Sequence, residues 1–124
     1  MVSTKLRNVK IRDLTPVLLF YFGCEADERT ALWAFDPRMG LGAKPVFSSD
    51  FTHFDVPDFA DVIPEAFEMV EKGFVTEQDF REFTFTNAAM LHARNNPGFF
   101  KGTVVEQAVA DELGLERASP AATA

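Results

Sequence analysis

The order of two short apolar runs constrains the fold of this chain more than any other feature. Residues 17–22 form an unbroken run between Pro16 and Gly23, and residues 44–47 form a second run. A run of this kind is typical of a strand buried on both faces of a parallel sheet. Residues 28–35, between the runs, predict a short helix, so the order strand–helix–strand implies a right-handed crossover and a parallel pair. Two parallel strands need cover on both faces and both edges, so we expect a larger structure around them.

An amphipathic helix is predicted at residues 58–72, with Asp58 or Asp61 as its N-cap. Lys72 lies in its last turn, and Gly73 follows as a stop signal. Its apolar face is predicted to consist of Val62, Ile63, Ala66, Phe67 and Val70.

A second helix is predicted to begin after Thr76, whose side chain suits an N-cap. It carries Phe80 and Phe83 on one side and continues, with a bend, as far as residue 93. Residues 104–113 predict a last short helix. The chain therefore has an α/β pattern in which two strands are followed mostly by helices.

Composition excludes several classes of function. The formal net charge is −7 and the isoelectric point is about 4.7, so the chain repels phosphate backbones and no nucleic-acid partner is expected. No stretch reaches the roughly 18 apolar residues of a membrane span. Residues 14–24 resemble a secretion signal, but Thr15 and Pro16 interrupt its apolar core. The single cysteine, Cys24, fits a reducing compartment, so we expect a cytoplasmic protein.

Acidic residues follow both predicted strands. Asp50 comes just after the second run, at the edge of the sheet where α/β proteins place their chemistry, so it suits a metal ligand or a proton acceptor. Alternatively, Ser48, Ser49 and Asp50 only satisfy backbone donors in a turn, which composition alone favours. His53 suits a ligand or a proton shuttle, or else a plain loop residue. Glu25 follows the first run and is either part of the same site or simply solvated.

Several motifs in this order resemble one family. They are "FGCEADERTALWAFDPR", "VFSSDFTHFDVPD" and "VIPEAFEMVEKGFVTEQDFREFTFTNAAMLHARNNPGFFKGTVVE", which together cover most of residues 20–106. These segments resemble the carboxyl-terminal part of amidohydrolase family 2, the metal-dependent (β/α)8-barrel enzymes related to aminocarboxymuconate-semialdehyde decarboxylase. The resemblance implies a C-terminal fragment of a TIM (β/α)8 barrel.

The resemblance also implies a division of the chain and a set of site residues. Residues 1–15 are a basic lead-in, residues 16–113 hold the last two β/α units and the closing helices, and residues 114–124 are a disordered tail. Asp50 matches the aspartate after the eighth strand, which ligates the metal or transfers a proton. His53 matches a histidine at the active-site mouth and Glu25 matches the acid after the seventh strand, and both are expected to contact the substrate.

The same family pattern is incomplete in this chain. The His-x-His after the first strand and the mid-barrel histidine have no counterpart, and Ser49 replaces the usual glycine. We therefore expect part of a hydrolase or decarboxylase for a small organic substrate, whose complete form binds zinc or manganese. The chain alone is expected to bind no metal tightly and to be inactive, and to pair with a missing barrel half or with further copies. The alternative is a non-catalytic acidic helical module that oligomerises or docks on a partner.

Overall fold

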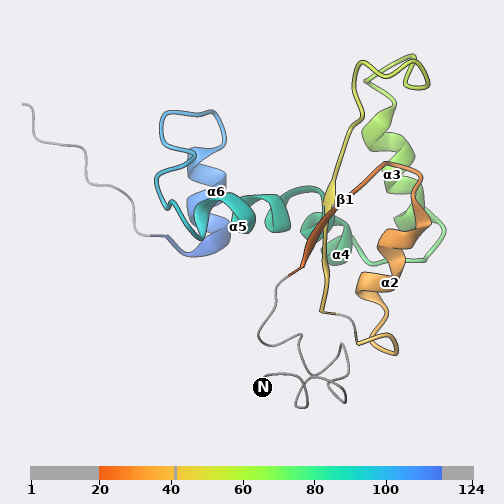
Figure 1. Cartoon of the computed structure of the whole chain (residues 1–124), viewed down its shortest axis with the longest axis horizontal. Helices are drawn as coiled ribbons and strands as arrows, with labels where there is room; N and C mark the ends of the chain where they lie inside the picture. The colour runs from red at the N-terminus through yellow and green to blue at the C-terminus, as the bar shows by residue number, and fades with distance from the viewer. Residues whose placement is uncertain (1–19, 41, 116–124) are drawn as a thin grey trace, which may run out of the picture.

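The core of the fold is a parallel pair of short strands. The computed structural model describes residues 20–40 and 42–115. Strand β1 (Tyr21–Cys24) pairs in parallel with β2 (Lys44–Phe47), in a register that sets Tyr21 opposite Lys44 and Cys24 opposite Phe47. A helical segment, η1 (Arg29–Ala31) followed by α2 (Leu32–Phe35), connects the strands (Figure 1). The predicted strand–helix–strand order and parallel pairing are therefore confirmed.

Two backbone hydrogen bonds extend this pairing beyond both strand ends. Lys44 N donates to Phe20 O at 2.6 Å, and Ser48 N donates to Cys24 O at 2.8 Å. β1 thus reaches Cys24, two residues past the predicted end at residue 22, because the ladder still has a partner there. The part of the prediction at residues 17–19 lies outside the described residues, as do the basic lead-in 1–15 and the tail residues 116–124.

The expectation that the first strand is buried on both faces is wrong for its described part. Gly23 is exposed and Tyr21 and Phe22 are only half-buried, whereas Cys24 is buried. Within the described ranges the sheet has two strands and does not close into a barrel, so part of its surface has no cover.

Helix α3 (Val62–Glu71) begins four residues later than predicted, because Asp58 starts a turn instead of a helix. The Oδ1 atom of Asp58 accepts a hydrogen bond from Ala60 N at 2.8 Å. Asp61 occupies the N-cap position but makes no capping bond through its side chain. The buried face also differs from the prediction, since the helix buries Val62, Ala66 and Met69 and leaves Ile63 exposed.

One continuous helical rod follows, made of α4 (Glu77–Arg81), η2 (Glu82–Thr86) and α5 (Asn87–Ala93). Thr76 caps it as predicted: Asp79 N donates to Thr76 Oγ1 at 3.1 Å, and Thr76 N donates to Asp79 Oδ2 at 2.9 Å. Its middle part, η2, is π-helical, and Thr84 Oγ1 donates back to Phe80 O there at 2.8 Å. The predicted bend in this helix stays a prediction.

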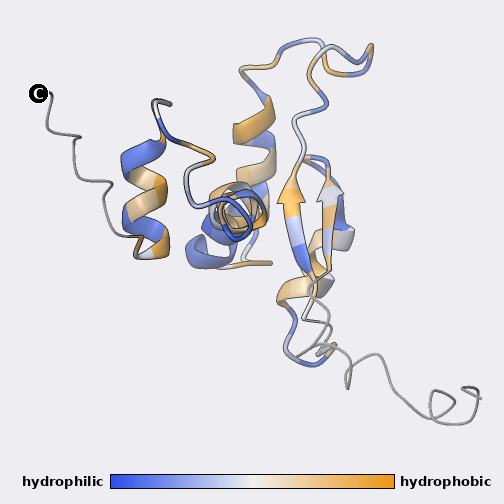
Figure 2. Ribbon diagram, turned by 60° about the vertical axis from the view of Figure 1, so that its left-hand side comes forward, coloured by the Kyte–Doolittle hydropathy of each residue, from blue (hydrophilic) through white to orange (hydrophobic). Residues whose placement is uncertain are grey.

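This rod holds the strand pair through one aromatic and one amide side chain. Phe83, which is 1% exposed, meets the ring of Phe47 edge-on at 5.6 Å between centroids. Asn87 is equally buried and donates from Nδ2 to Pro45 O at 2.9 Å. Proline has no backbone N–H, so the carbonyl is the one backbone polar group of Pro45. The hydrogen bond from Asn87 satisfies this carbonyl. Figure 2 shows the rod end-on beside the two strands.

The last helix, α6 (Glu106–Leu113), packs on the far part of the rod, two residues shorter than predicted. Arg81 donates to Glu112 Oε2 from Nε at 3.0 Å and from the guanidinium NH2 at 2.6 Å, and the Thr86 hydroxyl donates to the other carboxylate oxygen. The hydrogen bond from Arg81 is the main reason that the pKa of Glu112 lies below its usual value. Gly114 ends the helix with a left-handed backbone, φ 62°. None of the helices in the described ranges has the length and hydrophobicity of a bilayer-spanning segment.

Replacing Asn87 by alanine is expected to lower the free energy of unfolding by about 1–3 kcal/mol, because the buried carbonyl of Pro45 loses its donor. Urea denaturation monitored by circular dichroism measures the change. The control is Asn95→Ala, at an exposed asparagine, which should change the stability by less than about 0.5 kcal/mol. Equal effects of the two substitutions would show that the Asn87 bond does not hold the rod to the sheet.

Candidate functional site

The candidate site lies where both strands end. Glu25 directly follows β1, and Asp50 lies three residues beyond the end of β2. Parallel pairing brings the two strand ends to the same edge of the sheet, which is the edge where open α/β sheets bind ligands. Glu25, Asp50 and Asp55 line one hollow there, of about 190 Å³. The predicted position of Asp50 at the end of a parallel strand is therefore confirmed.

The backbone of the loop decides what the Asp50 side chain can do. Asp50 has a left-handed backbone (φ 48°), and so does Thr52 (φ 85°). Ser49 does not have a positive φ, so its backbone does not require a glycine. A side-chain hydrogen bond to the turn backbone comes from Ser49, whose Oγ accepts from Phe51 N at 3.4 Å. The Asp50 carboxylate contacts another side chain.

That side chain is His53. Asp50 Oδ2 and His53 Nδ1 are 2.8 Å apart, and His53 N donates to Asp50 O at 3.0 Å. The carboxylate is 26% exposed and the imidazole 62% exposed, so solvent reaches the pair. A neutral imidazole that donates from Nδ1 to a carboxylate keeps Nε2 free as an acceptor or a metal ligand. The contact thus orients His53 and leaves its second nitrogen available.

A third donor, Asp55, completes this group. Asp50, His53 and Asp55 each offer one ligand atom, and these atoms all lie within 4.8 Å of one another. The types of donor fit zinc, which catalytic sites hold through three protein ligands with one position open. The sequence prediction named Asp50 as a ligand and missed Asp55, although the spacing Asp-x-x-His-x-Asp was a signal for it.

Glu25 faces these acids across the hollow. Its pKa is raised, chiefly by the negative charge of Asp50, then by burial and by the charge of Asp55. The structure therefore brings together all three residues predicted for the site, Glu25, Asp50 and His53. Their roles in metal binding, catalysis and substrate contact remain predictions.

Cys24 lies next to this edge but is no nucleophile. It is 1% exposed, and burial, followed by the charge of Glu28, raises the pKa of its thiol to about 11. The thiolate is the reactive form of cysteine, and it is scarcely populated at neutral pH with such a pKa. Cys24 is instead a small residue of the buried core.

A scan of the chain against protein-family models finds no match, and searches among curated proteins and among solved structures find none either.

Replacing Asp50 by asparagine is expected to lower the pKa of Glu25 toward its usual value, because the substitution removes the charge that acts most strongly on it. Carbon-detected NMR titration of the glutamate carboxyl groups measures this. The control is Asp58→Asn, which removes an acid of the same loop that does not contribute to the shift. A Glu25 pKa that is the same in the Asp50→Asn variant and the unmodified chain would show that the two residues do not share a site.

Proposed function

We propose that this chain supplies the last two strands and the closing helices of an amidohydrolase-like barrel, a metal-dependent hydrolase or decarboxylase for a small organic substrate. The observation that carries the proposal is the meeting of Glu25 and Asp50 at the carboxyl ends of adjacent parallel strands, with His53 held on Asp50. Barrel enzymes place their catalytic residues at this end of their strands. The motifs that resemble amidohydrolase family 2 lie in the same segments.

The state of the sheet agrees with this proposal. A complete barrel has eight strands and takes about 250 residues. The described residues form two strands, one of which has half-buried and exposed side chains where a barrel strand would be covered. Under the proposal, strands from outside this chain cover β1 and bring the remaining ligands.

Within such an enzyme each residue of the site has a task. Asp50, with His53 and Asp55 beside it, would hold the zinc or manganese, which supplies a bound water of lowered pKa. Asp50 would either ligate the metal or accept the proton of the attacking water, and the exposed imidazole of His53 would contact the substrate. Glu25 lines the same hollow as Asp50, and under the proposal its side chain contacts the substrate there. The single buried cysteine is consistent with a cytoplasmic location.

The chain alone is expected to bind zinc or manganese more weakly than micromolar and to show no turnover. Its three donors come from one exposed loop, and no other described residue belongs to the group. Calorimetric titration with each metal measures the affinity. Asp50→Asn should abolish the residual binding, whereas the control Asp58→Asn should retain it.

Two results would contradict this account. Micromolar zinc affinity or measurable hydrolysis or decarboxylation by the chain alone would show that the site is already complete. A reading frame upstream of Met1 that encodes no strands with a His-x-His motif, in frame or one frameshift away, would remove the barrel half on which the proposal depends.

A second candidate is a non-catalytic acidic module that binds a partner or further copies of itself. The observation that favours it is the number of large apolar side chains on the surface, among them Phe54 at 99% and Phe59 at 66% exposure. Both candidates predict that apolar surface is covered, but only the module is stable and monodisperse without a barrel half. A soluble homo-oligomer of fixed size with cooperative melting favours this candidate over the first.

A further inference from the structure

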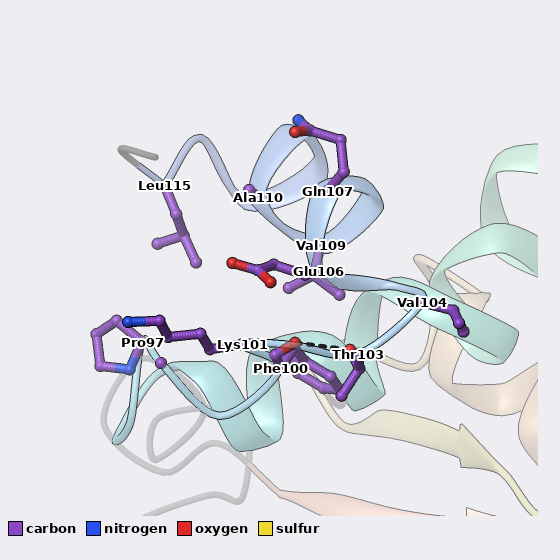
Figure 3. Close-up of a pocket in the computed structure, with 11 residues that line it drawn as sticks. Pro97, Phe100, Lys101, Thr103, Val104, Glu106, Gln107, Val109, Ala110 and Leu115 are labelled. Atoms are coloured by element: carbon purple, nitrogen blue, oxygen red, sulfur yellow. Dashed lines mark hydrogen bonds between the residues drawn. The ribbon is translucent and has the colours of Figure 1, made fainter. Parts of the chain in front are cut away.

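A second hollow, unrelated to the acidic edge of the sheet, lies between the loop at residues 97–104 and helix α6 (Figure 3). Its volume is about 400 Å³, and it shares no lining residue with the hollow at Glu25 and Asp50. In Figure 1, α6 lies at the left of the molecule, whereas α3 lies on the other side of the strands. The function of this hollow therefore has to be sought in its own residues.

The base of the hollow is apolar and firmly packed. Val109 is 2% exposed and belongs to a buried cluster with Ala89 and Ala93, against which Phe100 and Leu115 pack. Phe100, Val109 and Leu115 line the hollow. They form an apolar surface suited to a medium-sized aliphatic side chain.

Two opposite charges lie over this base without pairing. The side chains of Lys101 and Glu106 both extend into the space between the loop and α6 (Figure 3). None of the ion pairs found in the described residues joins Lys101 to Glu106. Glu106 Oε2 accepts a hydrogen bond from Gly102 N at 2.7 Å, which fixes the carboxylate and leaves Oε1 for a ligand.

The loop that carries Lys101 is held in place by its own hydrogen bonds. Phe100 O accepts from Thr103 N at 3.0 Å and from Thr103 Oγ1 at 2.6 Å, and Lys101 N donates to Gly98 O at 3.0 Å. A site formed before the ligand arrives loses less entropy on binding than a site that must be ordered.

We propose that this hollow binds a free α-amino acid with an aliphatic side chain. The carboxylate of the ligand pairs with Lys101, its ammonium pairs with Glu106 Oε1, and its side chain lies on Phe100, Val109 and Leu115. The two protein charges select for a zwitterion: Glu106 repels a plain carboxylate, and Lys101 repels a plain amine. An amino acid satisfies both charges and covers the apolar base at the same time.

The test uses L-leucine and the full chain. Titration followed by amide NMR is expected to shift signals of residues 97–110 and to give a saturable binding curve. N-acetyl-leucine and leucine amide each lack one of the two ligand charges. Each should bind at least about tenfold more weakly than leucine, because a charged hydrogen bond is lost.

Substitutions test the same two contacts from the side of the protein. Lys101→Gln and Glu106→Gln should each weaken leucine binding about tenfold. The glutamine at position 106 keeps an oxygen that accepts from Gly102 N, so the loop is preserved, and circular dichroism checks the fold. The matched controls are Lys72→Gln and Glu71→Gln. Glu71 is the last residue of α3, Lys72 follows it, and neither lines this hollow, so both substitutions should leave the affinity unchanged.

The proposal is overturned if leucine at millimolar concentration shifts no signal of residues 97–110. Equal binding of leucine by the Lys101→Gln and Glu106→Gln variants and by the unmodified chain would overturn it as well. So would equal binding of leucine and its two singly charged derivatives, because the zwitterion would then not be what is recognised.

Discussion

The parallel pairing of β1 and β2 is the constraint on which the rest of the structure depends. Parallel strands end at the same edge, so residues that follow them meet although more than twenty positions separate them in the sequence. Glu25 and Asp50 are brought together in this way. The pair does not stand alone, because a two-stranded parallel sheet has little stability of its own. Phe83 and Asn87 of the helical rod secure β2, and Cys24 anchors β1 in the same core.

Local signals in the sequence were sufficient where one short-range interaction decides the structure. The second strand was predicted at the residues where it occurs, and the cap at Thr76 follows from two reciprocal bonds with Asp79. The prediction failed where a tertiary contact or a turn competes. Helix α3 starts late because Asp58 bonds Ala60 N, and Met69 replaces Ile63 on its buried face because the core lies on that side. The spacing Asp-x-x-His-x-Asp places Asp55 near His53 in the sequence, but the positive φ angles at Asp50 and Thr52, which shape the loop that brings Asp55 to the same group, are not evident from the sequence.

Two of the hollows in the described part of the chain differ in their chemistry. The edge of the sheet gathers acids and one histidine, and the negative charge of Asp50 is the main cause of the raised pKa of Glu25. The hollow beside α6 instead sets one positive and one negative side chain over an apolar base. Under the proposed function, strands from elsewhere would complete the first, whereas the second is formed by one loop and one helix of this chain.

Amide hydrogen exchange at Ser48 tests the central claim most directly. Ser48 N donates to Cys24 O, the last bond of the strand pair before Asp50. If parallel pairing places the site, this amide and that of Lys44 should exchange only through global unfolding, far more slowly than an exposed loop amide such as that of Phe54. Exchange of Ser48 as fast as that of Phe54 would contradict the account, because the strand ends would then not be held together.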